Sequence, residues 1–212
     1  ETSSSSLYER LRSPAPRPPQ SIVALAPAQD LPFSQLEALS LKGAKTFLEH
    51  KATTDILFEN NADALAIAAH GRLSVENPLT NGFVFYESKD NDNEKEEELL
   101  VTVKELFELK RAPSLVTLSA CHAWDQNANS DHNLSTPWLS MANAFAVAGS
   151  QSVVASQGRV SDLAASVLMK RFYRNLRIHS RAESLKRASL IVRDYFKHPA
   201  HWASFALVGD PR

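Results

Sequence analysis

Short apolar runs alternate with amphipathic segments along most of the chain, from residue 21 onward. The apolar runs predict strands at 21–26, 45–48, 64–69, 83–86, 99–103, 114–121, 152–155 and 202–208. The amphipathic segments predict helices at 34–42, 54–60, 103–110, 136–149, 161–176 and 180–195. Strands that alternate with helices are typical of an α/β sandwich with a mostly parallel sheet.

Two of the predicted strands end in residues that can carry chemistry. The run 64–69 is apolar at every position, as expected of an interior strand covered by helices on both faces, and His70 and Gly71 follow it. The run 114–121 follows a break at Pro113 and stops at Cys121, the only cysteine of the chain. The connection between the two runs suits a hairpin and one helix, so we expect the strands to be neighbours. Their carboxyl ends would then meet at one edge of the sheet, where ligands and catalytic groups are found.

Local patterns also predict where helices begin. Ser34 with Glu37, and Ser180 with Glu183, have the spacing of a capping box, in which the Ser and Glu side chains satisfy each other's backbone amides. The acidic stretch 90–98 predicts a solvated loop between two strands rather than a binding tail.

Composition narrows the class of protein. The net charge is −1 at pH 7, so the charge balance implies no electrostatic partner. The apolar runs are far shorter than the roughly 18 residues that a membrane span needs. A single cysteine permits no intramolecular disulfide, and residues 1–6 show no signal peptide. We therefore expect a soluble, cytoplasmic protein.

The amino-terminal stretch differs in composition from the rest. Residues 1–20 are rich in Ser and Pro, which stiffens a chain without giving it a core. The chain has no initiator Met, so we expect a fragment in which 1–20 is a linker from an absent amino-terminal region. The folded domain is then expected to span 21–212.

His70 and Cys121 together suggest nucleophilic catalysis. Side by side, an imidazolium favours a thiolate and supplies a proton donor next to it. The backbone amides of Gly71 and Cys121 could then hold an oxyanion. Taken singly, each side chain suits a structural role: packing for the thiol, and a bond to a backbone carbonyl for the imidazole. At the ends of two such strands, about 50 residues apart, a catalytic dyad is the better hypothesis.

Four blocks of sequence carry a resemblance to a known family. They are Ala68-Ala69-His70-Gly71, Leu118-Ser119-Ala120-Cys121, the stretch 146–156 with Gly149, and the stretch 198–205 followed by Gly209-Asp210. In this order, between about residues 21 and 210, they resemble the CHAT domain. CHAT domains are caspase-like cysteine peptidases, related also to separase and usually found after TPR repeats.

The resemblance implies a three-layer, caspase-like sandwich with a mostly parallel central sheet and helices on both faces. It also implies a CHAT-like peptidase domain at 21–212 that hydrolyses peptide bonds without a cofactor, with Cys121 as nucleophile and His70 as general base and acid. The partners implied are a specific protein substrate and an amino-terminal TPR region or activating partner in a longer chain. Neither a membrane nor direct binding of nucleic acid is implied. Family members serve in bacterial defence, so a regulated defence or signalling protease is expected.

The sequence departs from the family around the expected cleft. After the cysteine it has His122-Ala123-Trp124 where members often have Glu-Thr-Gly, and Gln157-Gly158-Arg159 replaces a common Leu-Trp pair. The candidate substrate-binding residues in these segments are His122, Asp125, Asp131, Gly158, Arg159 and Asp162. The two loop aspartates suit a basic substrate side chain, whereas Arg72 or Arg159 would suit an acidic one. Ordinary loop solvation, and a helix-start role for Asp162, are the alternatives.

Three other readings stay open. The chain could be a catalytically silent CHAT-like scaffold or protein-binding module. A metal site could form from His122, Asp125, Asp131 and His132, although these loop positions are irregularly spaced and the chain has no second cysteine. Basic residues on the last two long helices could bind nucleic acid, or could be the solvated face of two core helices: Lys170, Arg171, Arg174, Arg177, Arg181, Lys186 and Arg187.

Overall fold

The computed structural model describes residues 18–72, 74, 77–88, 96–122, 136–157 and 160–212. Its strands are β1 (Ile22–Ala26), β2 (Ala44–Leu48), β3 (Ala64–Arg72), β4 (Gly82–Ser88), β5 (Glu96–Thr102), β6 (Leu115–His122), β7 (Ser152–Ser156) and β8 (Phe205–Gly209). Its helices are α2 (Pro32–Ser40), α3 (Thr54–Glu59), α4 (Val103–Leu106), α5 (Thr136–Val147), α6 (Asp162–Asn175), α7 (Arg181–Tyr195) and α8 (Pro199–Trp202). Two 3₁₀ turns, Glu49–Lys51 and Pro78–Thr80, join neighbouring elements.

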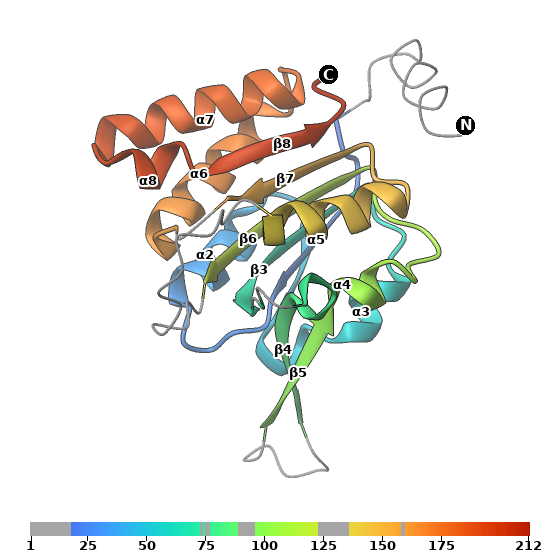
Figure 1. Cartoon of the computed structure of the whole chain (residues 1–212). Helices are drawn as coiled ribbons and strands as arrows, with labels where there is room; N and C mark the ends of the chain where they lie inside the picture. Colours follow the sequence, from blue (N-terminus) through green and yellow to red (C-terminus); the bar gives the residue numbers. More distant parts are fainter. Residues whose placement is uncertain (1–17, 73, 75–76, 89–95, 123–135, 158–159) are drawn as a thin grey trace.

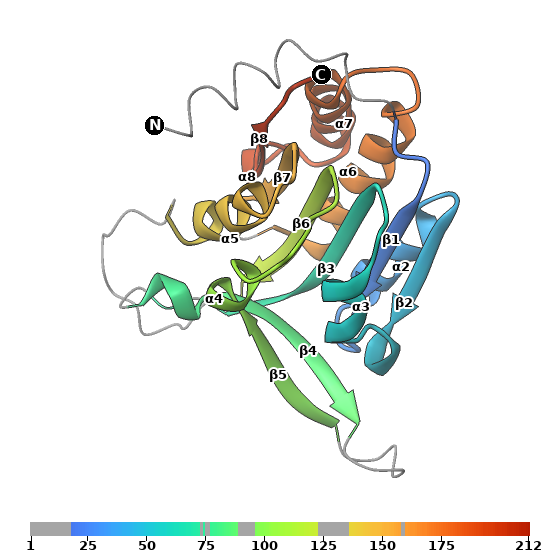
Figure 2. The same cartoon turned by 90° about the vertical axis from the view of Figure 1, so that its right-hand side faces the viewer.

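The strands form one mostly parallel sheet. Its order is β2-β1-β3-β6-β7-β8, and every neighbouring pair is parallel except β7 with β8 at the edge. Strands β4 and β5 form an antiparallel hairpin that joins the sheet through the outer end of β3. The hairpin projects away from the body of the protein, as Figure 2 shows.

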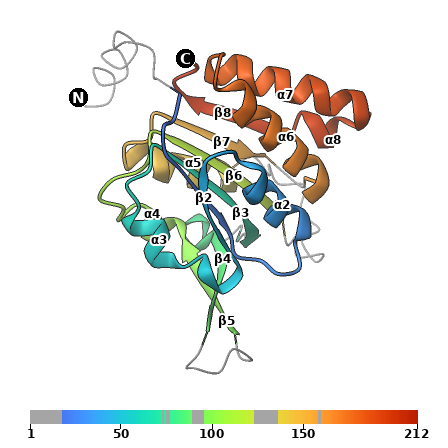
Figure 3. The same ribbon diagram turned by 180° about the vertical axis from the view of Figure 1, so that it is seen from behind.

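Helices cover both faces of the sheet, so the protein has two cores. On one face, α3, α4 and α5 pack on the sheet, with Leu57, Leu106 and Phe145 fully buried. On the other face lie α2, α6 and α7 (Figure 3), with Ala38, Leu168 and Val192 buried. This arrangement confirms the expected three-layer α/β sandwich, and strand alternation explains it, because successive residues of a buried strand supply opposite cores.

The boundaries of several elements differ from the sequence prediction. Strand β5 begins at Glu96, within the acidic stretch expected to be a loop, because it pairs with β4 as far as Ser88. Helix α4 ends at Leu106 rather than at Lys110. Trp202 belongs to α8, and the last strand begins only at Phe205. Strand pairing sets the two strand boundaries, and a local sequence pattern does not contain that pairing.

One predicted capping box is wrong. Helix α2 begins at Pro32, whose missing amide N–H and fixed φ suit the first helical position. Ser34 therefore lies inside the first turn, where its hydroxyl donates to the Leu31 carbonyl at 2.7 Å. Glu37 does not reach back to a cap but is buried beneath the helix.

The other predicted cap is present in part. Ser180 accepts a hydrogen bond from the Glu183 amide at 3.3 Å, so it caps α7 as expected. The Glu183 carboxylate pairs instead with Arg187, at 2.7 Å. A complete, reciprocal capping box occurs at Thr102 and Glu105, where it starts the four-residue helix α4.

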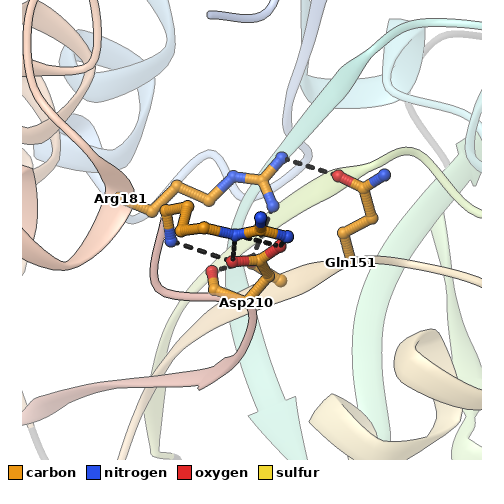
Figure 4. Close-up of polar contacts among 5 residues, drawn as sticks. Gln151, Arg181 and Asp210 are labelled. Carbon is orange, nitrogen blue, oxygen red and sulfur yellow. Dashed lines mark hydrogen bonds and ion pairs between the residues drawn. The ribbon is translucent and has the colours of Figure 1, made fainter. Parts of the chain in front are cut away.

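A buried polar network joins α7 to β7 and β8 at the amino-terminal end of the parallel strands (Figure 4). Arg181, the first residue of α7, donates to the Ser152 hydroxyl at 2.7 Å and to the Gln151 side-chain oxygen at 3.3 Å. Ser152 in turn donates to the Asp210 carbonyl at 2.6 Å. The Asp210 carboxylate accepts from Arg212 at 2.7 Å, and these contacts hold the pKa of Asp210 below its usual value. The network fixes the last strand and the chain end to the sheet.

Candidate active site

His70 and Cys121 occupy facing positions on neighbouring strands. They are register partners across the parallel β3–β6 ladder, near the carboxyl ends of both strands. The prediction that the two strands are adjacent is confirmed. Register partners on parallel strands lie on the same face of a sheet, so positions 70 and 121 share the face that α2 and α6 cover.

Asp30 contacts the His70 imidazole. Its carboxylate oxygen Oδ1 lies 2.7 Å from His70 Nε2, and the two side chains are 71% and 21% exposed, respectively. Asp30 belongs to the loop between β1 and α2, which places it at the carboxyl end of a third parallel strand. A neutral imidazole that donates Nε2–H to this carboxylate has Nδ1 free to accept a proton, so the contact selects a tautomer suited to a base.

Asp162 lies within electrostatic reach of this pair. It is the first residue of α6, and its Oδ2 accepts a hydrogen bond from the Phe33 amide at 2.9 Å. Partial burial raises the pKa of Asp162, while the Phe33 hydrogen bond and the His70 ring oppose the rise and the Asp30 charge adds to it. Helix α6 therefore delivers a carboxyl group to the same region as His70 and Asp30.

Glu37 lies beneath this region, between α2 and β6. Burial raises its pKa to about 8, with partial compensation by the hydroxyl of Ser119 and a further rise from the Asp162 charge. Ser119 is two residues before Cys121 on β6, on the same face of the strand. Within the part of the chain that the structure describes, Glu37 Oε1 and Ser119 Oγ are buried without a well-formed hydrogen bond. The residues beneath this site thus include buried polar atoms without a well-formed hydrogen bond.

A family comparison agrees with this architecture. The family model of the CHAT domain matches residues 2–210, which is nearly the whole chain. The chain belongs to the CHAT domain family. The family is related to caspase-like peptidases, and the mostly parallel sheet between two helical layers is consistent with a caspase-like sandwich. The match also includes the stretch that the sequence predicts as a linker.

A curated relative of this CHAT domain is associated with TPR repeats by name. The chain is 30% identical over 116 residues to tetratricopeptide repeat protein 28 of Mus musculus. The matching segment covers 53% of the chain but only 4% of the mouse protein. The chain thus spans a small part of this relative's length.

The remaining predicted site residues fall into two groups. Gly71 is in register with His122 of β6 on one side and with Phe83 of β4 on the other, so both residues lie inside the sheet rather than in loops. The strands therefore continue past the dyad positions, because the β4–β5 hairpin extends the edge of β3. The other pocket candidates lie outside the described residues: Asp125, Asp131, Gly158 and Arg159.

Asp30 and Glu37 are the contributors to this region that the sequence prediction missed. A signal for Asp30 was present, since it follows the first apolar strand just as His70 and Cys121 follow theirs. Glu37 carried the opposite signal, because its spacing from Ser34 predicts a surface cap. Of the predicted pocket residues, Asp162 is the one whose described side chain lies near His70.

The structure also bears on the metal and membrane readings. The described residues contain no cluster of three or more His, Cys, Asp or Glu side chains arranged to hold a metal. Three of the four ligands considered from the sequence, Asp125, Asp131 and His132, lie outside the described residues. No helix in the described part of the chain is both long and apolar enough to span a bilayer.

Proposed function

We propose that this CHAT domain is a cysteine endopeptidase in which His70 and Cys121 form the catalytic dyad. The observation that carries the proposal is that His70 and Cys121 are register partners at the carboxyl end of two adjacent parallel strands. Asp30 contacts Nε2 of the His70 imidazole. Residues that share an edge, a face and a register position are well placed for direct proton transfer.

The proposed reaction proceeds through an acyl-enzyme. His70 accepts the thiol proton, and the Cys121 sulfur attacks the carbonyl carbon of the scissile peptide bond. The imidazolium then donates that proton to the leaving amine as the C–N bond breaks, which leaves a thioester on Cys121. Water adds to the thioester with His70 as base, and the thiol and a new carboxyl terminus are regenerated.

Asp30 is proposed as a positioning residue for His70. Its 2.7 Å contact with Nε2 fixes the ring orientation, and its negative charge stabilises the imidazolium that forms when the thiol ionises. Asp162 adds a second carboxyl group near the same ring. Both groups lie near the ring at the step where it carries the thiol proton.

The developing oxyanion needs backbone donors at the same edge. We propose the amides of Gly71 and Cys121 for this role, as the sequence suggests. Gly71 is in register with Phe83 and His122. A glycine at this position lets a substrate approach the backbone closely.

The substrate is proposed to be a specific protein whose cleavage site lacks an acidic side chain next to the scissile bond. Asp30 and Asp162 give the region near His70 a negative potential, which disfavours acidic groups. Arg72, the candidate partner of an acidic side chain, forms an exposed ion pair with Glu98 at 2.5 Å. Substrate contacts from His122, Asp125, Asp131, Gly158 and Arg159 stay predictions.

The biological setting is proposed from the family. A match to a TPR protein supports a domain that works in a longer chain, where TPR repeats or a partner control it. CHAT peptidases that serve in bacterial defence suggest regulated, site-specific cleavage in the cytoplasm. On this proposal, the isolated chain can be inactive until its activator is supplied.

Two experiments test the proposal. A candidate host proteome is incubated with the full-length native protein and with its Cys121→Ala form, and new peptide termini are identified by mass spectrometry. Termini that appear with the native protein alone support the peptidase and give the cleavage site. Iodoacetamide labelling of Cys121 near neutral pH then separates the main alternative: slow, ordinary labelling together with no cleavage would indicate a silent scaffold or binding module.

A further inference from the structure

A hollow lined by basic side chains lies at the opposite end of the sheet from His70. Its volume is about 750 Å³, and its walls include Ile22, the first residue of β1, and Gly43, which precedes β2. Lys42 lines one wall, from the loop after α2. Lys170, Arg174 and Arg177 line the other wall, on α6 and the turn that follows it. No Asp or Glu occurs among the described residues that line it.

These four cations differ from Arg181, Lys186 and Arg187 of α7 in their contacts. None of them makes an ion pair or hydrogen bond with another described residue. By contrast, Arg181 is buried against Ser152 and Gln151, and Lys186 and Arg187 both pair with Glu183. Of the basic residues that the sequence places on the last two long helices, Lys170, Arg174 and Arg177 therefore line the hollow, whereas Arg171 does not.

The cations around the hollow repel one another, and a bound anion would offset that repulsion. Lys170 and Arg174 lie four residues apart on one face of α6, where like charges repel by a few tenths of a kcal/mol, and Arg177 follows in the turn after the helix. The helix dipole favours cations in the last turn of α6, which accounts for Arg174 alone within the helix. It does not account for Lys42, which faces the hollow from a different element.

The lining of the hollow also includes apolar and aromatic residues. Tyr173 is buried in its floor and shares a hydrogen bond of 3.0 Å with the Thr117 hydroxyl of β6. Leu176 and Ile22 contribute aliphatic surface, and Pro18 and Pro19 border the hollow on the side where the chain enters the fold. Organic ligands of proteins commonly occupy cavities of roughly 300–1,000 Å³ with apolar walls and a few charged groups.

We propose that this hollow binds a small organic molecule that carries two or more phosphate groups, such as a nucleoside diphosphate or triphosphate. The guanidinium groups of Arg174 and Arg177 match phosphate oxygens in a two-pronged geometry, and Lys42 and Lys170 add point charges from opposite walls. The apolar surface of Ile22 and Leu176 receives the organic part. A nucleic acid is less suitable, since these four cations line one hollow rather than an extended groove.

The experiment is a calorimetric titration of the 212-residue chain, in its Cys121→Ala form so that no peptidase activity enters the result. Sodium tripolyphosphate and ATP are titrated separately at physiological salt. The test variant is Lys42→Gln with Arg174→Gln, which removes one cation from each wall. The matched control is Lys186→Gln with Arg187→Gln, which removes the same charge from α7. Thermal unfolding of each variant without ligand verifies folding.

We expect saturable binding of both probes, with ATP tighter than tripolyphosphate. The test variant should lose about tenfold or more in affinity for each cation removed, while the control keeps its affinity. No binding of either probe, or an equal loss in the test and control variants, would overturn the proposal. Equal affinities for the two probes would overturn the organic part of it. A 20-nucleotide single strand that binds more tightly than ATP, with a steep salt dependence, would assign the cluster to nucleic acid instead.

Discussion

The two ends of the parallel sheet use polar side chains in opposite ways. At the amino-terminal end, the side chains of Arg181, Ser152 and Asp210 all have hydrogen-bond or ion-pair partners (Figure 4). At the carboxyl end, Glu37 and Ser119 are buried without well-formed partners, and burial raises the pKa of both Glu37 and Asp162. One end therefore stabilises the fold, and the other carries a polar cluster that costs stability.

This difference separates structural from functional polar residues without any knowledge of the reaction. A buried polar group kept without a partner destabilises a protein by about 1–3 kcal/mol, so a sequence retains it only where something else requires it. His70, Asp30 and position 121 lie at the costly end. Sites of function are where the rules for stable packing are commonly broken. The comparison thus supports the choice of this edge for the proposed dyad.

The largest expected effect at the carboxyl end is the loss of the nucleophile. Cys121→Ala should reduce cleavage of an identified substrate by at least about a thousandfold, because no acyl-enzyme can form. The urea midpoint of unfolding should change little by comparison. The measurement is the rate of appearance of the new terminus under activating conditions. Activity that persists in this variant would remove Cys121 from the mechanism.

The largest expected effect at the amino-terminal end falls on stability. Arg181→Ala should lower the free energy of unfolding by about 3 kcal/mol, because it removes a buried cation and leaves Ser152 and Gln151 without a donor. Urea denaturation measures the change. The specific activity of the remaining folded protein should equal that of the wild type.

Arg187→Ala is the matched control on the same helix. Its exposed ion pair with Glu183 should contribute less than about 1 kcal/mol. If Arg181→Ala were as mild as this control, the assignment of a stabilising role to the amino-terminal end would be wrong.

Sequence patterns predicted the central strands β3 and β6 well because both are buried on both faces. The runs 64–69 and 114–121 needed no tertiary information to be read as strands, and we expected them to be adjacent because the connection between them suits a hairpin and one helix. Helix starts were harder. Helix α2 begins at Pro32 and not at the capping box expected from Ser34 and Glu37. A proline at the first helical position and a capping box are both start signals for the same turn, and only packing decides between them.

The sequence predicted His70 and Cys121 as a site because the adjacency of their two strands could be inferred, but it did not give the order of the other strands. Asp30 became a candidate once β1 was known to lie next to β3, which brings its loop to His70. No pattern in the sequence states that order. Glu37 and Asp162 meet in space only because α2 and α6 pack on the same face. Local sequence patterns do not reveal contacts between elements that lie far apart in the chain.

Asp30→Asn tests whether the charge of Asp30, at the carboxyl end of the sheet, acts on His70. The amide keeps the shape and can still contact His70, but it removes the charge that stabilises the imidazolium. We expect kcat to fall by about 10- to 100-fold with little change in KM, and the rate to become dependent on pH over a different range. Asp55→Asn, a change to an exposed carboxylate on α3, is the control. An unaltered pH profile would show that Asp30 does not act through His70.

Glu37→Gln tests how much the buried Glu37 carboxyl group destabilises the protein, through the pH dependence of the free energy of unfolding. The pKa of Glu37 is raised from 4.5 to about 8 in the folded protein, so the native state binds a proton that the unfolded chain releases above its own, lower pKa. Its contribution to stability is therefore fully present below pH 4.5 and is lost as pH rises through 8.

The glutamine variant carries no such proton, so it should match the wild type near pH 4.5. By pH 8 it should be more stable than the wild type by at least about 1.4 kcal/mol, the value of one pKa unit. Urea midpoints at pH 4.5, 6.5 and 8 measure this divergence, and parallel curves for the two proteins would mean that Glu37 titrates as an ordinary surface carboxyl group.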